Sequence, residues 1–324
     1  MTTLSDIEAA AARLQGVAIA TPLLQGTTLD AALGGRLLLK PECWQRTGSF
    51  KIRGAYNRLS LLSKQAAARG AVAWSSGNHA QGVAAAGRLL GIHTAIVMPQ
   101  DAPRAKLENT RRLGGEVISY DRYTGDREKI ARKIAAERGA ELVPSFEHPD
   151  VIAGQGTVGL EIASQSIEMG VKPDQVVIPC GGGGLTAGCA IALRGRWPDV
   201  KILVAEPEFY DDTTQSLQSN KRVHVPTSVP SLCDALLTEA PGELTLEIMR
   251  RHVAGGVVVT ESEVKAAMRI AFQELKLVVE PGGAAALAAV LSGRVATSNR
   301  VTAVVLSGGN VDFDVFSRIQ LEPA

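Results

Sequence analysis

Short apolar runs alternate along the chain with longer stretches in which apolar positions recur at helical spacing. The apolar runs predict strands at residues 71–74, 94–98, 116–120, 176–179, 202–205, 256–259 and 301–306. The intervening stretches predict helices, the clearest of them at residues 79–90, 126–136, 157–169 and 261–275. Short apolar strands separated by helices of this length are typical of βαβ units on a parallel sheet. The pattern therefore predicts an α/β protein.

The chain has 324 residues, which is long for one compact domain and predicts one large domain or two packed lobes. One helix start is clearly marked, because Thr260 and Glu263 fit a capping box. Residues 210–243 are rich in Asp, Thr, Ser and Pro and too long for a simple connector, so we expect an insertion or a functional loop there. Strand-to-helix junctions with Gly and Ser recur, and they place helix N-termini at the sheet edge where α/β proteins bind ligands.

Composition narrows the class of ligand. Hydrophobic residues make up 45% of the chain and charged residues 21%, as in ordinary globular proteins. The formal net charge is +1, which favours neither nucleic acid nor an anionic membrane as a partner. No apolar run reaches the roughly 18 residues of a membrane span, and the N-terminus lacks the pattern of a signal peptide. The scattered cysteines show no metal-binding spacing, so we expect reduced thiols in a cytoplasmic protein that binds a small, enclosed ligand.

A run of four glycines, Gly181 to Gly184, directly follows the predicted strand at 176–179. Consecutive glycines cost backbone entropy, but they let neighbouring N–H groups converge on one anion where a helix begins. A flexible turn is the alternative, and it rarely needs four glycines at a strand-to-helix junction. The run is neither a dinucleotide fingerprint nor a P-loop. It therefore predicts a phosphate site.

Lys51 stands between apolar Phe50 and Ile52, with Arg53 two residues further on. A lysine that is partly desolvated beside another cation loses its proton more readily and becomes a usable nucleophile. The alternative is a surface lysine at the start of a helix, and the local sequence alone favours it.

Two further strand ends lead into small polar residues. Residues 75–82 begin with two serines and include Asn78 and His79, a composition that suits a carboxylate at a helix N-terminus. His79 is more often a helix-start residue than a base, and Ser76 is equally suited to be an N-cap. The fourth junction is Ser307-Gly308-Gly309-Asn310. Taken singly, these signals indicate only an anion-binding α/β enzyme.

Taken together, the four motifs resemble one family. The order Ser49-Phe50-Lys51, then residues 76–79, then the glycine run, then residues 307–310 resembles the pyridoxal-phosphate enzymes of the tryptophan synthase β-subunit fold type. Within this type it is similar to the threonine/serine dehydratase and serine racemase branch, and the likeness extends over nearly the whole chain. It implies a two-lobed, three-layer fold of parallel sheets with the cofactor in the cleft. Residues 1–52 and 145–324 would form the large lobe and residues 53–144 the small one.

The resemblance also implies roles for single residues. Lys51 would hold pyridoxal phosphate as a Schiff base and remove the α-proton of the substrate. Phe50 would pack on the ring, Asn78 would bond its hydroxyl, and Ser307 would meet the pyridine nitrogen. A neutral hydroxyl cannot keep that nitrogen protonated, so the ring is a weaker electron sink, which suits loss of a β-substituent better than transamination.

Backbone N–H groups would hold the cofactor phosphate, from Gly181, Gly182, Gly183, Gly184 and Leu185. The substrate carboxylate would bind in the loop after the strand at 71–74, at Ser75, Ser76 and His79. In serine racemase the residue matching Ser76 faces the lysine across the cofactor and reprotonates Cα, so Ser76 is either that acid or only a carboxylate donor.

The implied reaction is α,β-elimination of a β-hydroxy amino acid such as L-threonine or L-serine to a 2-oxo acid and ammonia. Threo-3-hydroxyaspartate ammonia-lyase and serine- or aspartate-type racemase are the alternatives within the branch. Arg127 would favour a dicarboxylic substrate if it faces the site, and otherwise lies on a solvated helix face. A synthase of the same fold and a non-catalytic anion-binding module remain as other classes. The chain ends soon after Asn310, so we expect no isoleucine-sensing domain and a degradative role.

The segment that follows the predicted strand at 202–205 resembles the divalent-cation site of this branch. Glu206 and Asp212 would give carboxylates and Tyr210 its backbone carbonyl, a set that suits Mg²⁺ or Ca²⁺; an acidic surface loop is the alternative. The chain departs from the family at Asp234-Ala235, where Asp-Gly is usual, so a methyl group would press toward the cofactor edge and leave the substrate open. The resemblance further implies a homodimer.

Overall fold

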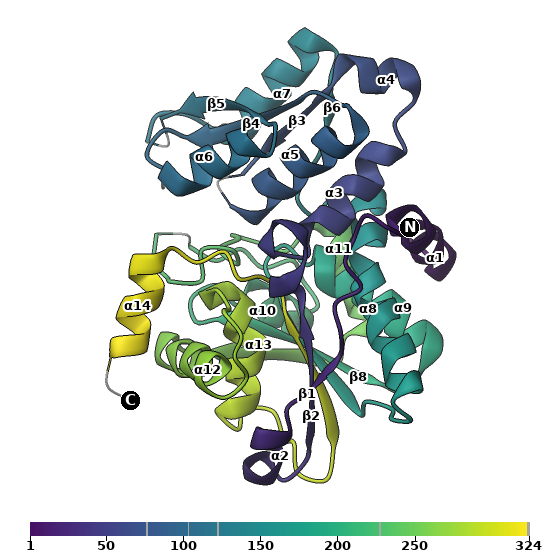
Figure 1. Ribbon diagram of the computed structural model, residues 1–324, viewed down its shortest axis with the longest axis vertical. Helices are drawn as coiled ribbons and strands as arrows, with labels where there is room; N and C mark the ends of the chain where they lie inside the picture. Colours follow the sequence, from purple (N-terminus) through teal and green to yellow (C-terminus); the bar gives the residue numbers. More distant parts are fainter. Residues whose placement is uncertain (76, 103, 122, 227, 323–324) are drawn as a thin grey trace.

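The computed structural model describes residues 1–75, 77–102, 104–121, 123–226 and 228–322. Within these residues the strands form two sheets, and helices cover both faces of each (Figure 1). The α/β fold of parallel layers predicted from the pattern is confirmed.

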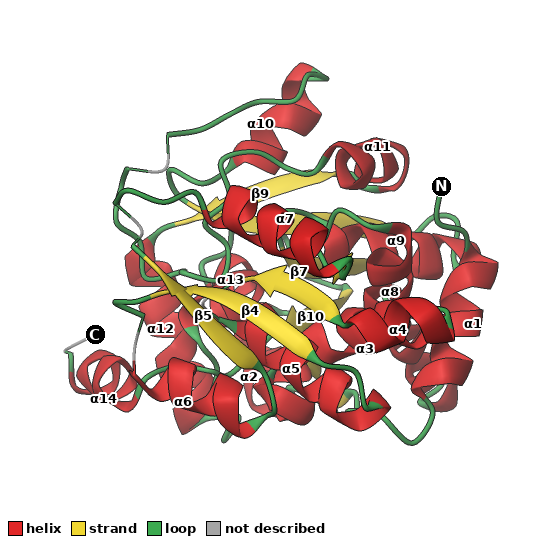
Figure 2. Cartoon of the chain, turned by 90° about the horizontal axis from the view of Figure 1, so that it is seen from above, coloured by secondary structure: helices red, strands yellow, loops and turns green. Residues whose placement is uncertain are grey.

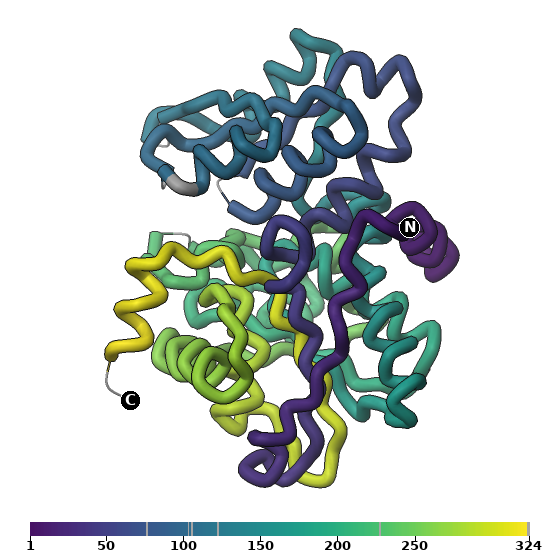
Figure 3. Tube along the Cα trace, viewed as in Figure 1, coloured from purple at the N-terminus to yellow at the C-terminus, as the bar shows by residue number. Residues whose placement is uncertain are grey.

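The six-stranded sheet, here called the large sheet, is built from both ends of the chain. Its order is β1-β2-β10-β7-β8-β9, and every pairing except that of β1 with β2 is parallel. Its strands are β1 (Leu24–Gln25), β2 (Arg36–Pro41), β7 (Gln175–Pro179), β8 (Lys201–Pro207), β9 (Gly255–Val259) and β10 (Val301–Leu306). The N-terminal strand β2 and the C-terminal strand β10 therefore run side by side (Figure 3).

Alternate residues of these strands are buried on opposite faces of the large sheet. In β2, Leu37 and Leu39 join one core cluster, whereas Leu38 joins the cluster on the other face. The first face is covered by α2 (Thr27–Leu33), α12 (Glu261–Gln273), α13 (Pro281–Leu291) and α14 (Phe313–Leu321). The second is covered by α8 (Pro149–Glu168) and α9 (Gly184–Arg196), with α1 (Leu4–Leu14) and α11 (Glu243–His252) packed against them.

The four-stranded sheet, here called the small sheet, is parallel throughout, in the order β5-β4-β3-β6. Its strands are β3 (Ala71–Trp74), β4 (Thr94–Pro99), β5 (Glu116–Tyr120) and β6 (Glu141–Leu142). One face packs on α3 (Lys51–Ser60), α5 (Asn78–Leu90) and α6 (Arg104–Arg112), and the other on α7 (Arg127–Arg138). Figure 2 shows α7 and α6 on opposite sides of β4 and β5. The short helix α4 (Lys64–Arg69) leads from α3 into β3.

The predicted strands agree with the structure to within two residues at each end. The capping box at Thr260 and Glu263 is also confirmed. The helix predicted at 157–169 was placed too late, because α8 begins at Pro149, where the His148 side chain accepts a hydrogen bond from the Asp150 N–H. The short strands β1 and β6 and the strand β2 were not predicted.

The segment 210–243 is neither a plain connector nor a separate layer. It contains α10 (Asp212–Ser219) and otherwise runs without strands through its described residues up to α11. Cys233 and Leu236 are buried in it and pack against the core of the large sheet. In the described part of the chain, no helix combines the length and the apolar character that crossing a membrane requires.

Candidate active site

Lys51 is the first residue of α3, at the carboxyl edge of the large sheet. After β2 the chain makes two 3-10 turns, Glu42–Trp44 and Arg46–Gly48, before α3 begins. The Phe50 N–H donates to the Ser307 carbonyl at 3.2 Å, and Ser49 forms an isolated bridge with Gly308. These backbone contacts bring Lys51 beside the turn that follows β10.

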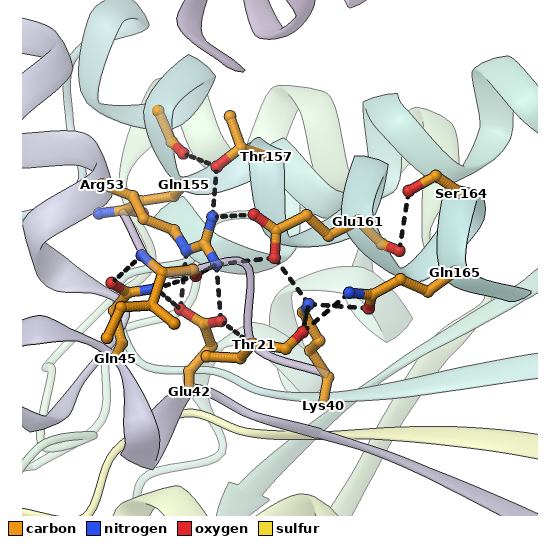
Figure 4. A network of polar contacts seen from close by, with 12 residues as sticks. Thr21, Lys40, Glu42, Gln45, Arg53, Gln155, Thr157, Glu161, Ser164 and Gln165 are labelled. Atoms are coloured by element: carbon orange, nitrogen blue, oxygen red, sulfur yellow. Dashed lines mark hydrogen bonds and ion pairs between the residues drawn. The ribbon is translucent and has the colours of Figure 1, made fainter. Parts of the chain in front are cut away.

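A buried network of charged side chains fixes the start of α3 (Figure 4). The Arg53 guanidinium forms ion pairs with Glu42 at 2.7 Å and with Glu161 at 2.6 Å, and Lys40 pairs with Glu161 at 2.6 Å. Burial alone would raise the pKa of Glu42, yet Arg53 and Lys40 hold it below its usual value. Two cations thus face two carboxylates, and this balance lets a fully buried arginine sit two residues after Lys51.

The Lys51 amine lies in an enclosed position. Its Nζ donates to the Ser145 carbonyl at 3.0 Å and lies 5.1 Å from the centre of the Phe50 ring. Burial lowers the pKa of Lys51 to about 8, while the carboxylate of Glu280 opposes the shift. A larger fraction of this amine is therefore neutral near neutral pH than in an ordinary lysine, which suits it to attack a carbonyl group.

The glycine run connects β7 to the N-terminus of α9. Gly183 has a φ of +89°, and a Cβ on Gly182 would overlap the Phe146 ring. A Cβ on Gly184 would lie 2.6 Å from Gln155 Oε1. The close approach of Phe146 explains why Gly182 and Gly184 carry no side chain. The helix dipole and backbone N–H groups at this N-terminus suit a phosphate, and Thr186 in the first turn has a buried hydroxyl without a partner.

Asn78 begins α5 and is held by two side chains from segments beside the large sheet. Its Nδ2 donates to Glu280 Oε1 at 2.6 Å, and its Oδ1 accepts from Asn310 Nδ2 at 2.7 Å. Burial raises the pKa of Glu280 to about 8, with Asp234 adding to the shift. Sequence reasoning missed Glu280. An acidic residue directly before a proline that opens an apolar helix was the available signal, and its burial shows only in the fold.

Ser307 and Leu185 are both buried, Ser307 directly after β10 and Leu185 in the first turn of α9. The turn at Ser307 follows β10, and the glycine run with Leu185 follows β7. These two strands are hydrogen-bonded neighbours. The carboxyl ends of adjacent parallel strands meet at one edge, so these residues lie on the same edge as Lys51.

The predicted carboxylate loop after β3 is partly described. Ser75 Oγ accepts from the Gly77 N–H at 3.2 Å at the start of α5. His79 is buried, and its Nε2 lies 2.8 Å from the Val143 carbonyl. Burial and the nearby Lys51 lower the pKa of His79 to about 3, so its ring is neutral. Ser76, the predicted acid opposite Lys51, lies outside the described residues.

Arg127 is the first residue of α7, and its side chain is exposed. A cation of the small-sheet side, Lys106 of α6, forms an ion pair with Asp234, with its Nζ 2.8 Å from Asp234 Oδ2. Burial alone would lower the pKa of Lys106, but Asp234 and the neighbouring acids hold it above its usual value. Sequence reasoning missed this ion pair as well.

Ala235, where the resemblance led us to expect glycine, lies against the start of α13. A Cβ on Gly282 would be 3.2 Å from the Ala235 Cβ. Gly282 is two residues after Glu280, so the extra methyl group stands beside the same helix start that presents Glu280. The next residue, Leu236, is buried against Gly181 of the glycine run.

Glu206 and Asp212, the predicted metal ligands, are both buried at the end of β8 and the start of α10. Burial raises the pKa of Glu206 to about 7 and that of Asp212 to about 8, the latter also because of Glu206. Asp212 Oδ2 is buried without a partner. Tyr210, which precedes α10, is also buried, and its hydroxyl donates to the Val229 carbonyl. Among the described residues, no cluster of three or more His, Cys, Asp or Glu side chains could hold a metal ion.

Comparison with known families identifies the class of enzyme to which this fold, and the site at the carboxyl edge of the large sheet, belong. The family described as pyridoxal-phosphate dependent enzymes matches residues 14–308 of the chain. This range includes Lys51, the glycine run and Ser307. The chain belongs to this family, and the resemblance inferred from the four motifs is confirmed.

Individual relatives lie within one branch. The chain is 41% identical over 314 residues to the L-threo-3-hydroxyaspartate ammonia-lyase of Pseudomonas sp, an alignment covering 97% of each chain. It is 40% identical to the L-threonine ammonia-lyase of Thermotoga maritima, covering 98% of this chain and 78% of that one. The solved structure of maize serine racemase matches with a TM-score of 0.92 and 36% identity, covering 98% of this chain and 96% of that chain. The chain is thus a pyridoxal-phosphate enzyme of the threonine/serine dehydratase type.

Proposed function

We propose that this enzyme catalyses α,β-elimination of a β-hydroxy amino acid, such as L-threonine or L-serine, to a 2-oxo acid and ammonia. The observation that carries the proposal is the buried amine of Lys51, with its lowered pKa, on the same edge as the glycine run and Ser307. The ammonia-lyases among its relatives support the same reaction class.

When bound, pyridoxal phosphate withdraws electrons from the Cα of an amino acid joined to it and so makes the α-proton acidic. The residues of the chain supply the rest. Lys51 would hold the cofactor covalently and then accept the α-proton, for which a pKa of about 8 is well matched to neutral pH. The N–H groups from Gly181 to Leu185 would hold the phosphate, and Phe50 would pack against the ring.

Ser307 would meet the ring nitrogen of the cofactor, and Asn78 its ring oxygen. A serine hydroxyl cannot transfer a full proton to the nitrogen as a carboxylic acid could. The ring is then a modest electron sink, which favours loss of a β-hydroxyl over transamination.

The substrate carboxylate would bind at the N-terminus of α5, at Ser75, Ser76 and His79. A helix of 13 residues presents free N–H groups and a positive dipole end to an anion there. His79 would contribute its backbone N–H, because its ring is neutral and its Nε2–H donates to the Val143 carbonyl. If Ser76 faces Lys51 across the cofactor, it would return a proton to Cα, and some racemisation would accompany elimination.

A second candidate substrate is threo-3-hydroxyaspartate. Relatives from Pseudomonas and Saccharomyces cerevisiae, 41% and 38% identical, are both L-threo-3-hydroxyaspartate ammonia-lyases. Its second carboxylate would need a cation at the cleft, for which Arg127 and Lys106 are the candidates on the small-sheet side.

The test is incubation with L-threonine, L-serine, and threo and erythro 3-hydroxyaspartate, with and without Mg²⁺. Keto acid, ammonia and the enantiomer ratio are measured, with Lys51→Ala as the inactive control. We expect keto acid and ammonia in equal amounts from at least one substrate. Failure of every substrate to give keto acid or inverted product would refute the lyase proposal. Turnover of sulfide or cysteine alone would indicate a synthase, and absence of any cofactor absorbance a binding module.

We also propose that Glu206, Asp212 and the Tyr210 carbonyl hold Mg²⁺ or Ca²⁺. The buried Asp212 Oδ2 without a partner supports this, because two adjacent buried carboxylates are costly unless a cation joins them. All of the proposed donors are oxygens, as these hard cations prefer.

Three coarser proposals complete the assignment. Residues 1–52 and 145–324 would form the large lobe and 53–144 the small lobe, since the strands of the small sheet all fall within residues 71–142. The enzyme would be a homodimer, which sedimentation velocity tests directly. A cytoplasmic location is supported by the free thiols of all four cysteines.

A further inference from the structure

Two side chains from segments beside the large sheet, Glu280 and Asn310, bond the side chain of Asn78, and the Thr47 carbonyl accepts from Asn310. Thr47, Asn310 and Glu280 lie far apart in the sequence, yet hydrogen bonds connect each of them to Asn78 directly or through one neighbour. This chain of contacts, here called the amide clamp, determines which way the Asn78 amide points.

The donor and acceptor roles in the clamp follow from the Thr47 carbonyl, which can only accept a hydrogen bond. The Thr47 carbonyl has no proton to give, so the Asn310 atom 2.7 Å away must be its NH₂ group. The second hydrogen of the same Nδ2 then points to Asn78, 2.7 Å away, and the Asn78 atom there must be its carbonyl oxygen. The Asn78 NH₂ group is left facing Glu280, whose Oε1 accepts one hydrogen at 2.6 Å.

The backbone conformation around the clamp indicates that the surrounding structure enforces these contacts. Thr47 has a φ of +64°, an uncommon conformation for a β-branched residue that persists only where the surroundings enforce it. Gly48 and Gly308 leave the space that the clamp needs. A Cβ on Gly48 would overlap Asn310 Oδ1, and one on Gly308 would overlap Glu280 Oε1.

One hydrogen of the Asn78 NH₂ group is not used by the clamp, while the Asn78 oxygen already accepts from Asn310. We propose that Asn310 and Glu280 are positioning residues that make Asn78 a hydrogen-bond donor toward the ring oxygen of the cofactor. A donor there stabilises the ionised form of that oxygen. The inference rests on the proposed function, because it takes pyridoxal phosphate as the ligand of Asn78.

The clamp also connects the two sheets. Asn78 begins α5 on the small-sheet side, whereas Thr47, Glu280 and Asn310 belong to the large-sheet side. The orientation of the amide therefore depends on the two sides standing at their observed separation.

The test uses Asn310→Asp, an isosteric change that removes both donated hydrogen bonds. Cofactor affinity is measured by titrating the apoenzyme, and the absorption spectrum of the substrate-free holoenzyme at fixed pH reports the ionisation of the ring oxygen. We expect the dissociation constant to rise about tenfold, equivalent to about 1.4 kcal/mol. The spectrum should shift from the band of the ionised form toward that of the neutral form.

Two further variants separate positioning from a general structural role. In an Asn78→Ala background, Asn310→Asp should cost clearly less affinity than in wild type and should not shift the spectrum further, because its effect on the ring oxygen passes through Asn78. The lost bond to the Thr47 carbonyl is common to both backgrounds. Glu280→Gln should keep near-wild-type affinity, since a glutamine oxygen can still accept from Asn78. Asn299→Asp, the same substitution at an exposed turn, is the matched control.

The outcomes are distinguishable. Additive effects of the Asn310 and Asn78 changes, or an unchanged spectrum in Asn310→Asp, would overturn the clamp. A wild-type enzyme that binds no pyridoxal phosphate would instead overturn the proposed function.

Discussion

Replacing Arg53 by methionine should be among the most destabilising single changes in this enzyme. The substitution keeps an unbranched side chain of similar length in α3 but removes the charge. In the structure the guanidinium bonds to Glu42 through Nε at 2.7 Å and Nη2 at 2.8 Å, and to Glu161 through Nη1 at 2.6 Å (Figure 4). Glu42 is 0% exposed, so water cannot replace these bonds.

The magnitude follows from the charge that is left behind. Without Arg53, Glu42 keeps the Thr21 hydroxyl at 2.7 Å and a Gln45 contact at 3.5 Å. Removing one partner of a buried ion pair costs about 3–5 kcal/mol. Native stability is about 5–15 kcal/mol, so the loss would be a large part of the total.

The assay is urea unfolding of the apoenzyme followed by tryptophan fluorescence. Arg58→Met is the matched control on the same helix, because its ion pairs with Glu141 and Asp150 are partly exposed and should be worth about 1 kcal/mol or less. In the double variant Arg53→Met/Glu42→Met, no unpaired carboxylate remains at this position. We expect it to recover about 2 kcal/mol or more of the loss.

The sign of the pH dependence gives a second check. In wild type, Arg53 helps to hold the pKa of Glu42 below its ordinary value, so this stabilisation is present above that value and is lost as pH falls. In Arg53→Met, Glu42 is penalised only while charged, so the difference from wild type should shrink in acid. A loss below about 1 kcal/mol at neutral pH, or one that the double variant does not relieve, would refute the charge-balance reasoning.

Three more changes test the site. Gly182→Ala should weaken cofactor binding by about 1–3 kcal/mol, because the new methyl group overlaps the Phe146 ring. Adding Phe146→Ala should restore part of the affinity. Equal affinity in wild type and Gly182→Ala would contradict phosphate binding by the glycine run. The rate of cofactor capture by the apoenzyme should fall about tenfold for each pH unit below the Lys51 pKa of about 8 and should become constant above it. Stopped-flow absorbance measures this rate. A pH-independent rate would exclude Lys51 as the attacking amine. Mg²⁺ or Ca²⁺ at a hundred times its dissociation constant should raise the free energy of unfolding by about 2.7 kcal/mol. Asp212→Asn should abolish this stabilisation. An equal stabilisation of wild type and Asp212→Asn would show that the metal binds elsewhere.

The position of Lys51 shows how sequence and structure share the assignment. Its immediate neighbours indicate nothing more than a lysine at a helix start. The order of four motifs along the chain was enough to make it the cofactor lysine of a known family, and the family match bears out that resemblance. Its lowered pKa, however, comes from burial beneath segments that lie far away in the sequence.

The sequence by itself determined every described strand except β1, β2 and β6, together with the parallel α/β class, the glycine run and the family, because each depends on spacing or on neighbouring residues. Only the tertiary structure showed that Glu280 is buried against Asn78, that Lys106 pairs with Asp234, and that Arg53 pairs with Glu42. Such contacts join residues brought together by the packing of two sheets. Burial, which sets their energies and their pKa values, is a property of that packing and not of any local pattern.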